Sequence, residues 1–176
     1  DLMQYAWMED SDDLPSCVAA AVAAIRAKYE SSDVGANMDG VVIPGLKAHY
    51  DTADIPTATE MDSALNNGIT PLWTNASGEV VLIRSVTTRS QDSNANPDYR
   101  VLDTTKVVVP DYIADDLEVG IADEFAGFKA SDDPPEGETP PPNVVTPSIM
   151  KDFVYSRLLV HERNGLDRKS TRLNSS

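Results

Sequence analysis

The sequence predicts an α/β fold of the α+β kind, with a mixed central sheet that contains a β-hairpin and is flanked by amphipathic helices. The first observation is an apolar run at Val80–Ile83, continued at 86–88, whose β-branched residues suit a packed strand. Both alternating faces of this run are apolar, so the strand needs cover on both sides and neighbours at both edges. The second observation is a shorter strand pattern at Ile69–Trp73, which turn residues at 75–78 separate from the run to make a hairpin. The third is the helical spacing of apolar residues before and after this hairpin.

Two helices are predicted before the hairpin. The first should follow Leu14-Pro15-Ser16 and run to about residue 30, because four apolar side chains recur at helical spacing: Val18, Val22, Ile25 and Tyr29. The second should run over residues 58–66, since Thr57 and Glu60 form a capping-box pattern at its start. An Asn-Gly pair then ends this helix and directs the chain into the hairpin.

Two further segments before the hairpin have the composition of strands. Residues 40–45 form a short β-branched run that ends at a Pro-Gly pair, and this strand should join the central sheet. Residues 1–8 are apolar and aromatic, and we expect them to be the end of an element whose partner lies upstream.

The chain after the hairpin alternates polar loops with helices. After a loop at 89–98, residues 99–102 predict a brief strand that pairs with the end of the central one. Asp103 and Thr104 are candidate caps of a helical stretch that Pro110 would break. The better helix should begin near Pro110, because a proline in a first turn lacks only an N–H that would be unpaired anyway. Residues 131–143 are rich in Pro, Asp and Glu and predict an irregular loop. A last helix should follow Thr146, an N-cap residue with proline after it. The apolar face of the Pro110 helix consists of Tyr112, Ile113, Leu117, Ile121 and Phe125.

The chain is strongly acidic, with a formal net charge of −15 over 176 residues. Its last ten residues read as a translated sequencing adapter and carry three basic residues against one acid, which leaves 11 basic and 28 acidic residues, a net charge of −17. Such a protein repels nucleic acids and anionic membranes, and no apolar run reaches membrane-spanning length. The acidity is compatible with keeping subunits apart before assembly and with a saline habitat, and the formal charge does not separate the two.

The residues predict no catalytic, cofactor-binding or metal site. Cys17 is the one cysteine, so no intrachain disulfide and no cysteine-based zinc site can form, and its place in an apolar helical pattern predicts a buried thiol. His49 lies in a polar stretch that predicts a surface position, and His161 lies among charged residues that predict a solvated or interface position. A Ser-His-Asp enzyme would need one of them as the base together with a nucleophile motif, and the sequence has no Gly-x-Ser-x-Gly, Walker A or HExxH motif. We therefore expect that the chain is not an enzyme.

A series of short segments keeps one order along residues 17–165: Ala19–Ala23, Val42–Gly45, Asn67–Leu72, Gly78–Val80, Arg84–Thr88, Tyr99–Asp103, Asp111–Ile113, Val144–Pro147 and Val160–Asn164. This ordered set resembles the C-terminal half of the contractile tail sheath proteins of Mu-like bacteriophages. Each segment alone would arise often by chance, so the specificity lies in the order.

The resemblance implies a structural subunit that polymerises around the phage tail tube and contracts to drive the tube through the host envelope. The implied partners are copies of the same chain in hexameric rings stacked as a helical sheath, the tail tube protein, the baseplate and the tail terminator, with no cofactor, no nucleic acid and no membrane. The implied location is the tail sheath of the virion, and the host cytoplasm during assembly. In the family, terminal arms add strands to the sheets of neighbouring subunits.

The same resemblance sets the expected organisation of the chain. Residues 1–130 form a sheath-like α/β core, 131–146 a loop rich in proline and acids, and 147–166 a helix and strand that return to the core. Residues 158–163 should be extended, because the matching region of the family is a strand. Residues 167–176 are the adapter-derived artefact, which truncates the C-terminal region of the family.

Two other classes of function stay open from the residues alone. One is an acidic binding or adhesion module of a phage or secreted protein. The other is a fragment of a hydrolase whose catalytic residues lie upstream. A tail-tube gene directly downstream would favour the sheath, whereas a serine-hydrolase motif upstream would favour the hydrolase fragment.

Overall fold

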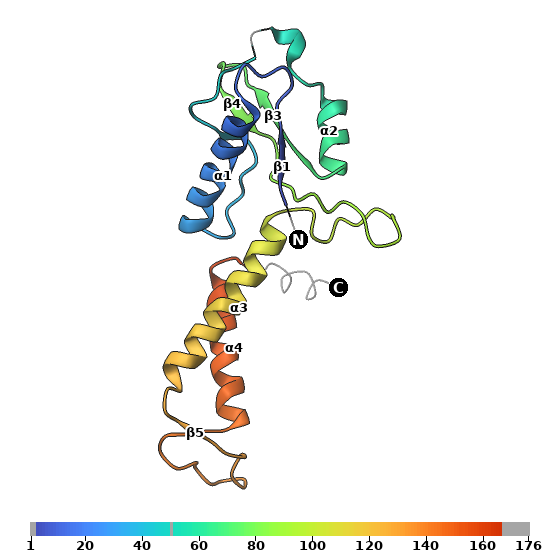
Figure 1. Ribbon diagram of the computed structural model, residues 1–176. Helices are drawn as coiled ribbons and strands as arrows, with labels where there is room; N and C mark the ends of the chain where they lie inside the picture. Colours follow the sequence, from blue (N-terminus) through green and yellow to red (C-terminus); the bar gives the residue numbers. More distant parts are fainter. Residues whose placement is uncertain (1–2, 50, 167–176) are drawn as a thin grey trace, which may run out of the picture. The chain divides into compact units, whose positions relative to one another are not determined.

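A computed structural model describes residues 3–49 and 51–166 of the chain, which divides into two compact units at Val108 (Figure 1). The prediction of an α+β fold with a mixed sheet is confirmed. The first unit contains β1 (Tyr5–Trp7), α1 (Pro15–Ser32), β2 (Val41–Val42), a 3-10 turn (Thr52–Asp54), α2 (Ala58–Asn66), β3 (Ile69–Thr74) and β4 (Val80–Leu82). The second contains most of α3 (Thr105–Glu124), β5 (Lys129–Ala130), β6 (Val144–Val145) and α4 (Pro147–Arg163).

The four strands of the first unit form one sheet in the order β1-β3-β4-β2. The predicted hairpin is β3 and β4, which pair antiparallel with Trp73 opposite Val81, and its turn is held by Asn75, whose Oδ1 accepts the N–H groups of Ser77 and Glu79. β4 has β3 on one side and β2 on the other, so the predicted central position is confirmed.

The central strand is shorter than predicted. Regular pairing ends at Leu82, and farther along Val86 makes only an isolated bridge, to Asp103. The reason is a side chain that replaces a backbone partner, since the Thr70 hydroxyl bonds both the N–H and the C=O of Val86. The segment at 99–102 is a turn and not the predicted strand, although the N–H of Thr87 donates to the C=O of Leu102 at 2.6 Å.

The N-terminal segment belongs to this sheet, and the expectation of an upstream partner is wrong. β1 pairs parallel with β3, with Tyr5 opposite Ile69 and Trp7 opposite Pro71. The hairpin leaves the far side of β3 open, and the β-forming residues of β1 fill it. A parallel neighbour sixty-odd residues away is invisible to local pattern, because parallel strands need a long crossover.

α1 and α2 lie on opposite sides of the sheet (Figure 1). The α1 side holds the main core, and the alternation predicted for the central strand is confirmed because Val80 and Leu82 belong to this core whereas Val81 does not. Core residues packed together on this side are Met8, Val18, Val22, Ile25, Met38, Ile43, Leu72, Val80 and Leu82. Cys17 points away from it and is exposed, so the prediction of a buried thiol is wrong.

The predicted cap and stop of α2 are both confirmed. The Thr57 side chain accepts the N–H of Glu60 while the Glu60 carboxylate accepts the N–H of Thr57, which is a complete capping box. Gly68 ends the helix with φ +74°, and a Cβ at this position would lie 2.7 Å from the carbonyl oxygen of Thr87. Glycine is therefore required here by the backbone angle and by the close approach of the following chain.

α3 begins earlier than predicted, at Thr105 rather than near Pro110. Asp103 starts it, because its Oδ1 accepts the N–H and hydroxyl of Thr105 at 3.1 and 2.7 Å. Pro110 therefore lies inside the helix, where its missing N–H leaves the carbonyl of Lys106 without the usual helical partner.

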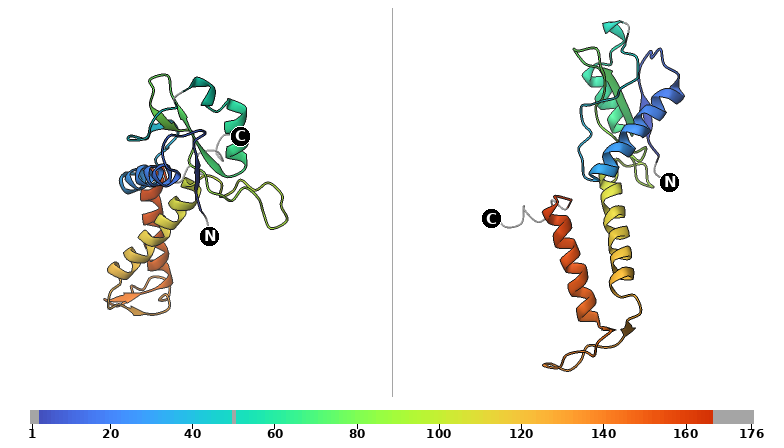
Figure 2. Two further views of the ribbon diagram at one scale, coloured as in Figure 1. Left: turned by 45° about the horizontal axis from the view of Figure 1, so that its top comes forward. Right: turned by 90° about the vertical axis from the view of Figure 1, so that its left-hand side faces the viewer.

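In the second unit α3 and α4 run antiparallel and are joined by the loop rich in proline and acids (Figure 2). The loop at 131–143 is irregular as predicted, with β5 and β6 pairing parallel at its base. The Thr146 cap of α4 is also confirmed, because its hydroxyl accepts the N–H of Ile149.

One prediction about the C-terminal segment differs from the structure. Residues 158–163 are helical and not extended, because no helix-breaking residue occurs before the Asn-Gly pair at 164–165. Residues 147–166 lie in the second unit, where Arg157 of α4 binds Asp116 of α3. The adapter-like segment 167–176 lies outside the described residues.

Candidate functional site

The two histidines are more enclosed than the sequence predicts. His49 is half-buried, and its Nδ1 lies 2.7 Å from the hydroxyl of Thr74, whose oxygen also accepts the backbone N–H of His49 at 3.0 Å. His161 is buried, and its Nε2 lies 2.9 Å from Oδ2 of Asp116. Of the two positions predicted for His161, solvated or at an interface, the solvated one is therefore wrong.

The Asp116–His161 pair combines the acid and the base of a catalytic triad, but with the ring reversed, because the acid of a triad binds Nδ1 and leaves Nε2 to the nucleophile, whereas Asp116 binds Nε2. Within residues 3–49 and 51–166, Nδ1 of His161 is buried and has no hydrogen-bond partner. The other oxygen of Asp116 binds Arg157 at 2.7 Å instead. This arrangement joins α3 to α4.

The described part of the chain offers no group of side chains for a metal ion and no helix suited to cross a membrane. There, no group of three or more His, Cys, Asp or Glu side chains is placed to hold a metal ion. Among the same residues, no helix combines the length and the apolar character needed to cross a bilayer.

A groove lies between α1 and β1, at the edge of the sheet. Its volume is about 330 Å³, and it is lined by Gln4, Ala6, Ala19, Val22, Ala23, Arg26, Ala27 and Glu30. The alanine side chains are short and leave the groove open. Arg26 is paired with Glu30, so their charges offset each other. The groove therefore suits an uncharged, extended segment better than a charged small molecule.

β1 is an edge strand. Among the described residues β3 is its only strand neighbour, so one row of its backbone groups has no ladder partner. Side chains alternate along the strand: Ala6 faces the α1 core, whereas Tyr5 lies on the other side and is 60% exposed. An unpaired edge is a template for adding a further strand.

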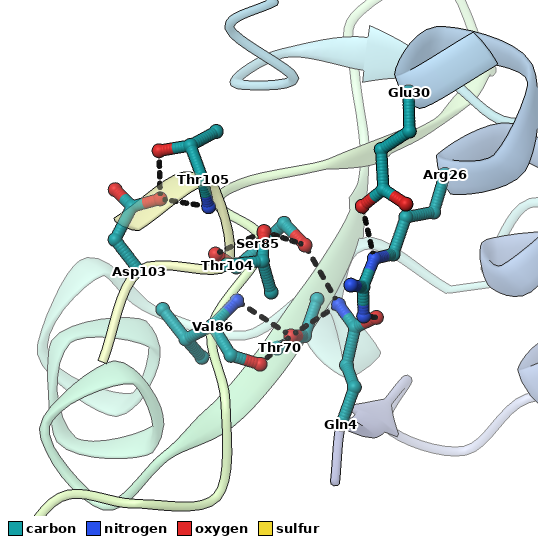
Figure 3. A network of polar contacts seen from close by, with 9 residues as sticks. All are labelled: Gln4, Arg26, Glu30, Thr70, Ser85, Val86, Asp103, Thr104 and Thr105. Carbon is teal, nitrogen blue, oxygen red and sulfur yellow. Dashed lines mark hydrogen bonds and ion pairs between the residues drawn. The ribbon is translucent and has the colours of Figure 1, made fainter. Parts of the chain in front are cut away.

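A network of polar side chains, of which Thr70, Ser85 and Thr104 are buried, ties the start of β1 to the rest of the sheet (Figure 3). The Gln4 amide donates to the hydroxyls of Thr70 at 3.0 Å and Ser85 at 2.9 Å, and the Thr104 hydroxyl bonds that of Ser85 at 2.9 Å. Arg26 donates to the other end of the Gln4 amide at 3.5 Å. The network ties the N-terminal strand to the hairpin and to the start of α3, which makes the edge rigid.

The sequence pattern contains one signal for this network that our prediction missed. Thr70 occupies an inward position of β3, on the same side as the core residue Leu72, and it is fully buried. A polar side chain at an inward strand position needs hydrogen-bond partners. The identity of those partners, Gln4 and Ser85, depends on a parallel pairing that the sequence does not reveal.

A second hollow of about 280 Å³ lies on the α2 side, lined by Asp62, Leu65, Asn66, Arg84, Val86, Tyr99, Leu102, Asp103 and Lys106. Arg84 binds Asp103 across it at 2.8 Å. Burial alone would raise the pKa of Asp103, but the hydrogen bonds from Arg84 and Thr105 outweigh it and hold that pKa below its usual value. The Arg84–Asp103 ion pair therefore holds the loop before α3 against the end of the central strand.

The loop before α3 contains a second acid with a lowered pKa. Asp98 accepts two hydrogen bonds from the side chain of Arg100, at 2.9 and 2.8 Å, and these keep the pKa of Asp98 well below its usual range. Both acids are therefore held as carboxylates by local partners and serve to fix the turn.

Comparison with models of known protein families gives no match, and a search of curated protein sequences gives none either. The resemblance to tail sheath proteins therefore rests on the ordered segments of the sequence.

Proposed function

We propose that this chain is part of a structural subunit of a contractile phage tail sheath, which polymerises around the tail tube and contracts to drive it through the host envelope. Two features support this proposal. One is the ordered set of sequence segments. The other, which carries the argument from geometry, is the open edge of β1 beside an uncharged groove.

Adding a neighbour's strand at this edge would join subunits through backbone hydrogen bonds. Neighbouring strands lie about 4.8 Å apart, so an added strand would run directly along β1. Its side chains on the α1 side would enter the groove, where Ala19, Ala23 and Ala27 leave room. Backbone pairing supplies affinity, and the groove selects small side chains.

The work of a sheath is also compatible with this architecture. Contraction moves subunits as near-rigid bodies between two lattices, so a subunit needs a firm core and no catalytic centre. The polar network from Gln4 to Thr104 provides such firmness around the edge to which a neighbour would attach.

The test uses the complete sheath gene, with the N-terminal half that the resemblance places upstream, expressed and imaged by electron microscopy. Tubes or rings are expected. Ala23→Arg should abolish them by filling the groove, whereas Ala24→Arg, also on the exposed surface of α1 but outside the groove, should leave them intact.

Residues 1–166 alone should assemble poorly, because the arms that join subunits are expected outside them. Tubes formed by this segment alone would contradict the expectation that it assembles poorly, and normal tubes from the Ala23→Arg variant would contradict the proposed role of the groove. Copurification of the protein with the tube protein is a second expected result.

A further inference from the structure

The second unit has little core of its own. In the described chain, every buried apolar side chain belongs to the first unit, and α3 has no buried residue at all. α3 and α4 meet through one stripe of side chains on each helix. These stripes are Tyr112, Asp116 and Gly120 on α3, and Phe153, Arg157 and His161 on α4.

A second pair of stripes lies beside the first. Successive residues of an α-helix are rotated by about 100°, so the residues that follow each contact residue form a neighbouring stripe. Because the helices are antiparallel, this rotation leads to the same side of the pair on both. On that side, which we name the aliphatic side, lie Ile113, Leu117, Ile121, Val154 and Leu158, and its stripe on α4 ends at Glu162.

The aliphatic side is uncovered within its own unit. None of its five side chains is buried, and Leu158 is 40% exposed. Acidic residues border these five side chains, with Glu118 next to Leu117 on α3 and Glu162 at the end of the α4 stripe. α3 as a whole has six acidic residues against one lysine. A partner that fits this surface has an apolar stripe of its own and positive charges beside it.

We propose that the aliphatic side binds an amphipathic helix of another polypeptide, with apolar residues against the five side chains and basic residues next to α3. Such a helix would complete a three-helix bundle and bury the side chains that α3 and α4 leave open. The pair of helices α3 and α4 is preorganised for binding, because Asp116 binds both Arg157 and His161 and fixes the two helices relative to each other before the partner binds.

A second copy of this chain fits the surface less well. Two copies would each bring a net charge of −15, and that repulsion opposes association. A basic helix does not meet this difficulty, and the small area of five aliphatic side chains fits a weak complex. This proposal is independent of the sheath function, because it concerns a different surface of the chain.

The probe is a designed fluorescent peptide of about 18 residues, long enough for five helical turns, with leucines at i, i+3, i+4 and i+7 and lysines elsewhere. Binding to the full chain is measured by fluorescence anisotropy at physiological salt, and we expect a Kd of about 1–10 μM. A scrambled peptide of the same composition should bind at least about tenfold more weakly, because it lacks the apolar stripe.

Matched substitutions locate the binding surface. Leu117→Asp and Leu158→Asp should each weaken binding by about tenfold or more, since each places a charge against the apolar stripe. Val119→Asp and Val160→Asp are the controls, because two residues along a helix is a rotation of about 200° and places them off the aliphatic side. Both valines are exposed, at 58% and 50%.

Far-ultraviolet circular dichroism checks that each variant keeps its helices, and the exposed position of Leu158 keeps the test decisive if Leu117→Asp unfolds. Equal binding of the scrambled peptide, no binding, or equal losses in the control variants would each overturn the proposal. So would a dimer in sedimentation experiments that Leu158→Asp dissociates, since the occupant would then be a second copy.

Discussion

Replacing Thr70 by valine tests whether a side chain stands in for the missing part of the central strand. The Thr70 hydroxyl is fully buried, accepts the N–H of Val86 at 3.1 Å and donates to its C=O at 3.2 Å. Valine has nearly the same shape but leaves both Val86 groups buried without partners. At about 1–3 kcal/mol for each unsatisfied group, partly relieved by local relaxation, the expected loss is about 2–4 kcal/mol.

The assay is urea unfolding followed by tryptophan fluorescence. Both tryptophans of the chain, Trp7 and Trp73, lie in strands of the first unit, so the signal reports on that unit. With a slope of about 1–1.5 kcal/mol per molar urea for a unit of this size, the midpoint should fall by about 1.3–4 M.

Thr70→Ser is the control, because serine keeps the hydroxyl and removes only one methyl group, which costs about 1 kcal/mol. A loss below about 0.5 kcal/mol in Thr70→Val, or an equal loss in both variants, would refute the argument that the hydroxyl replaces a backbone partner.

Three further predictions concern single positions. Gly68→Ala should destabilise the first unit by about 2 kcal/mol or more, since its Cβ would meet the Thr87 carbonyl, whereas Gly78→Ala, with the same positive φ but open space around it, should cost about 1 kcal/mol in the same urea assay. The pKa of Asp103 is lower in the folded chain than its ordinary value, so its contribution to stability is present above about pH 4 and is lost as pH falls through the folded pKa; Arg84→Ala should move that loss to higher pH, and an unchanged pH profile would contradict the pairing. Cys17 is exposed, so a maleimide should label it in the native protein within a few-fold of its rate in denaturant, and strong protection would argue against the exposed position.

The hairpin and the two helices before it could be predicted because their signals are local. The capping box of Thr57 and Glu60, the turn residues after Trp73 and the helical spacing around Val22 each act within a few residues. Local chemistry of this kind survives in the folded chain because nothing in the tertiary structure opposes it.

The errors occurred where distant residues decide the structure. The start of α3 depends on Asp103, which is held by Arg84 from the end of the hairpin, and this support outweighs the proline rule that favoured Pro110. The enclosure of His161 depends on Asp116 from the facing helix. The candidate edge of the sheet could not be predicted, because β1 finds its partner across most of the first unit.

That pairing has a consequence for how the protein forms during synthesis. Within the first unit β1 is made before its ladder partner β3, before Ser85, which accepts a hydrogen bond from the adjacent Gln4, and before Thr104, which binds Ser85. Until these residues have left the ribosome, β1 lacks the contacts that hold it, and such non-local contacts slow folding. The N-terminal strand is thus the last piece of the first unit to lock, and a nascent chain keeps it available to other binding partners for longest.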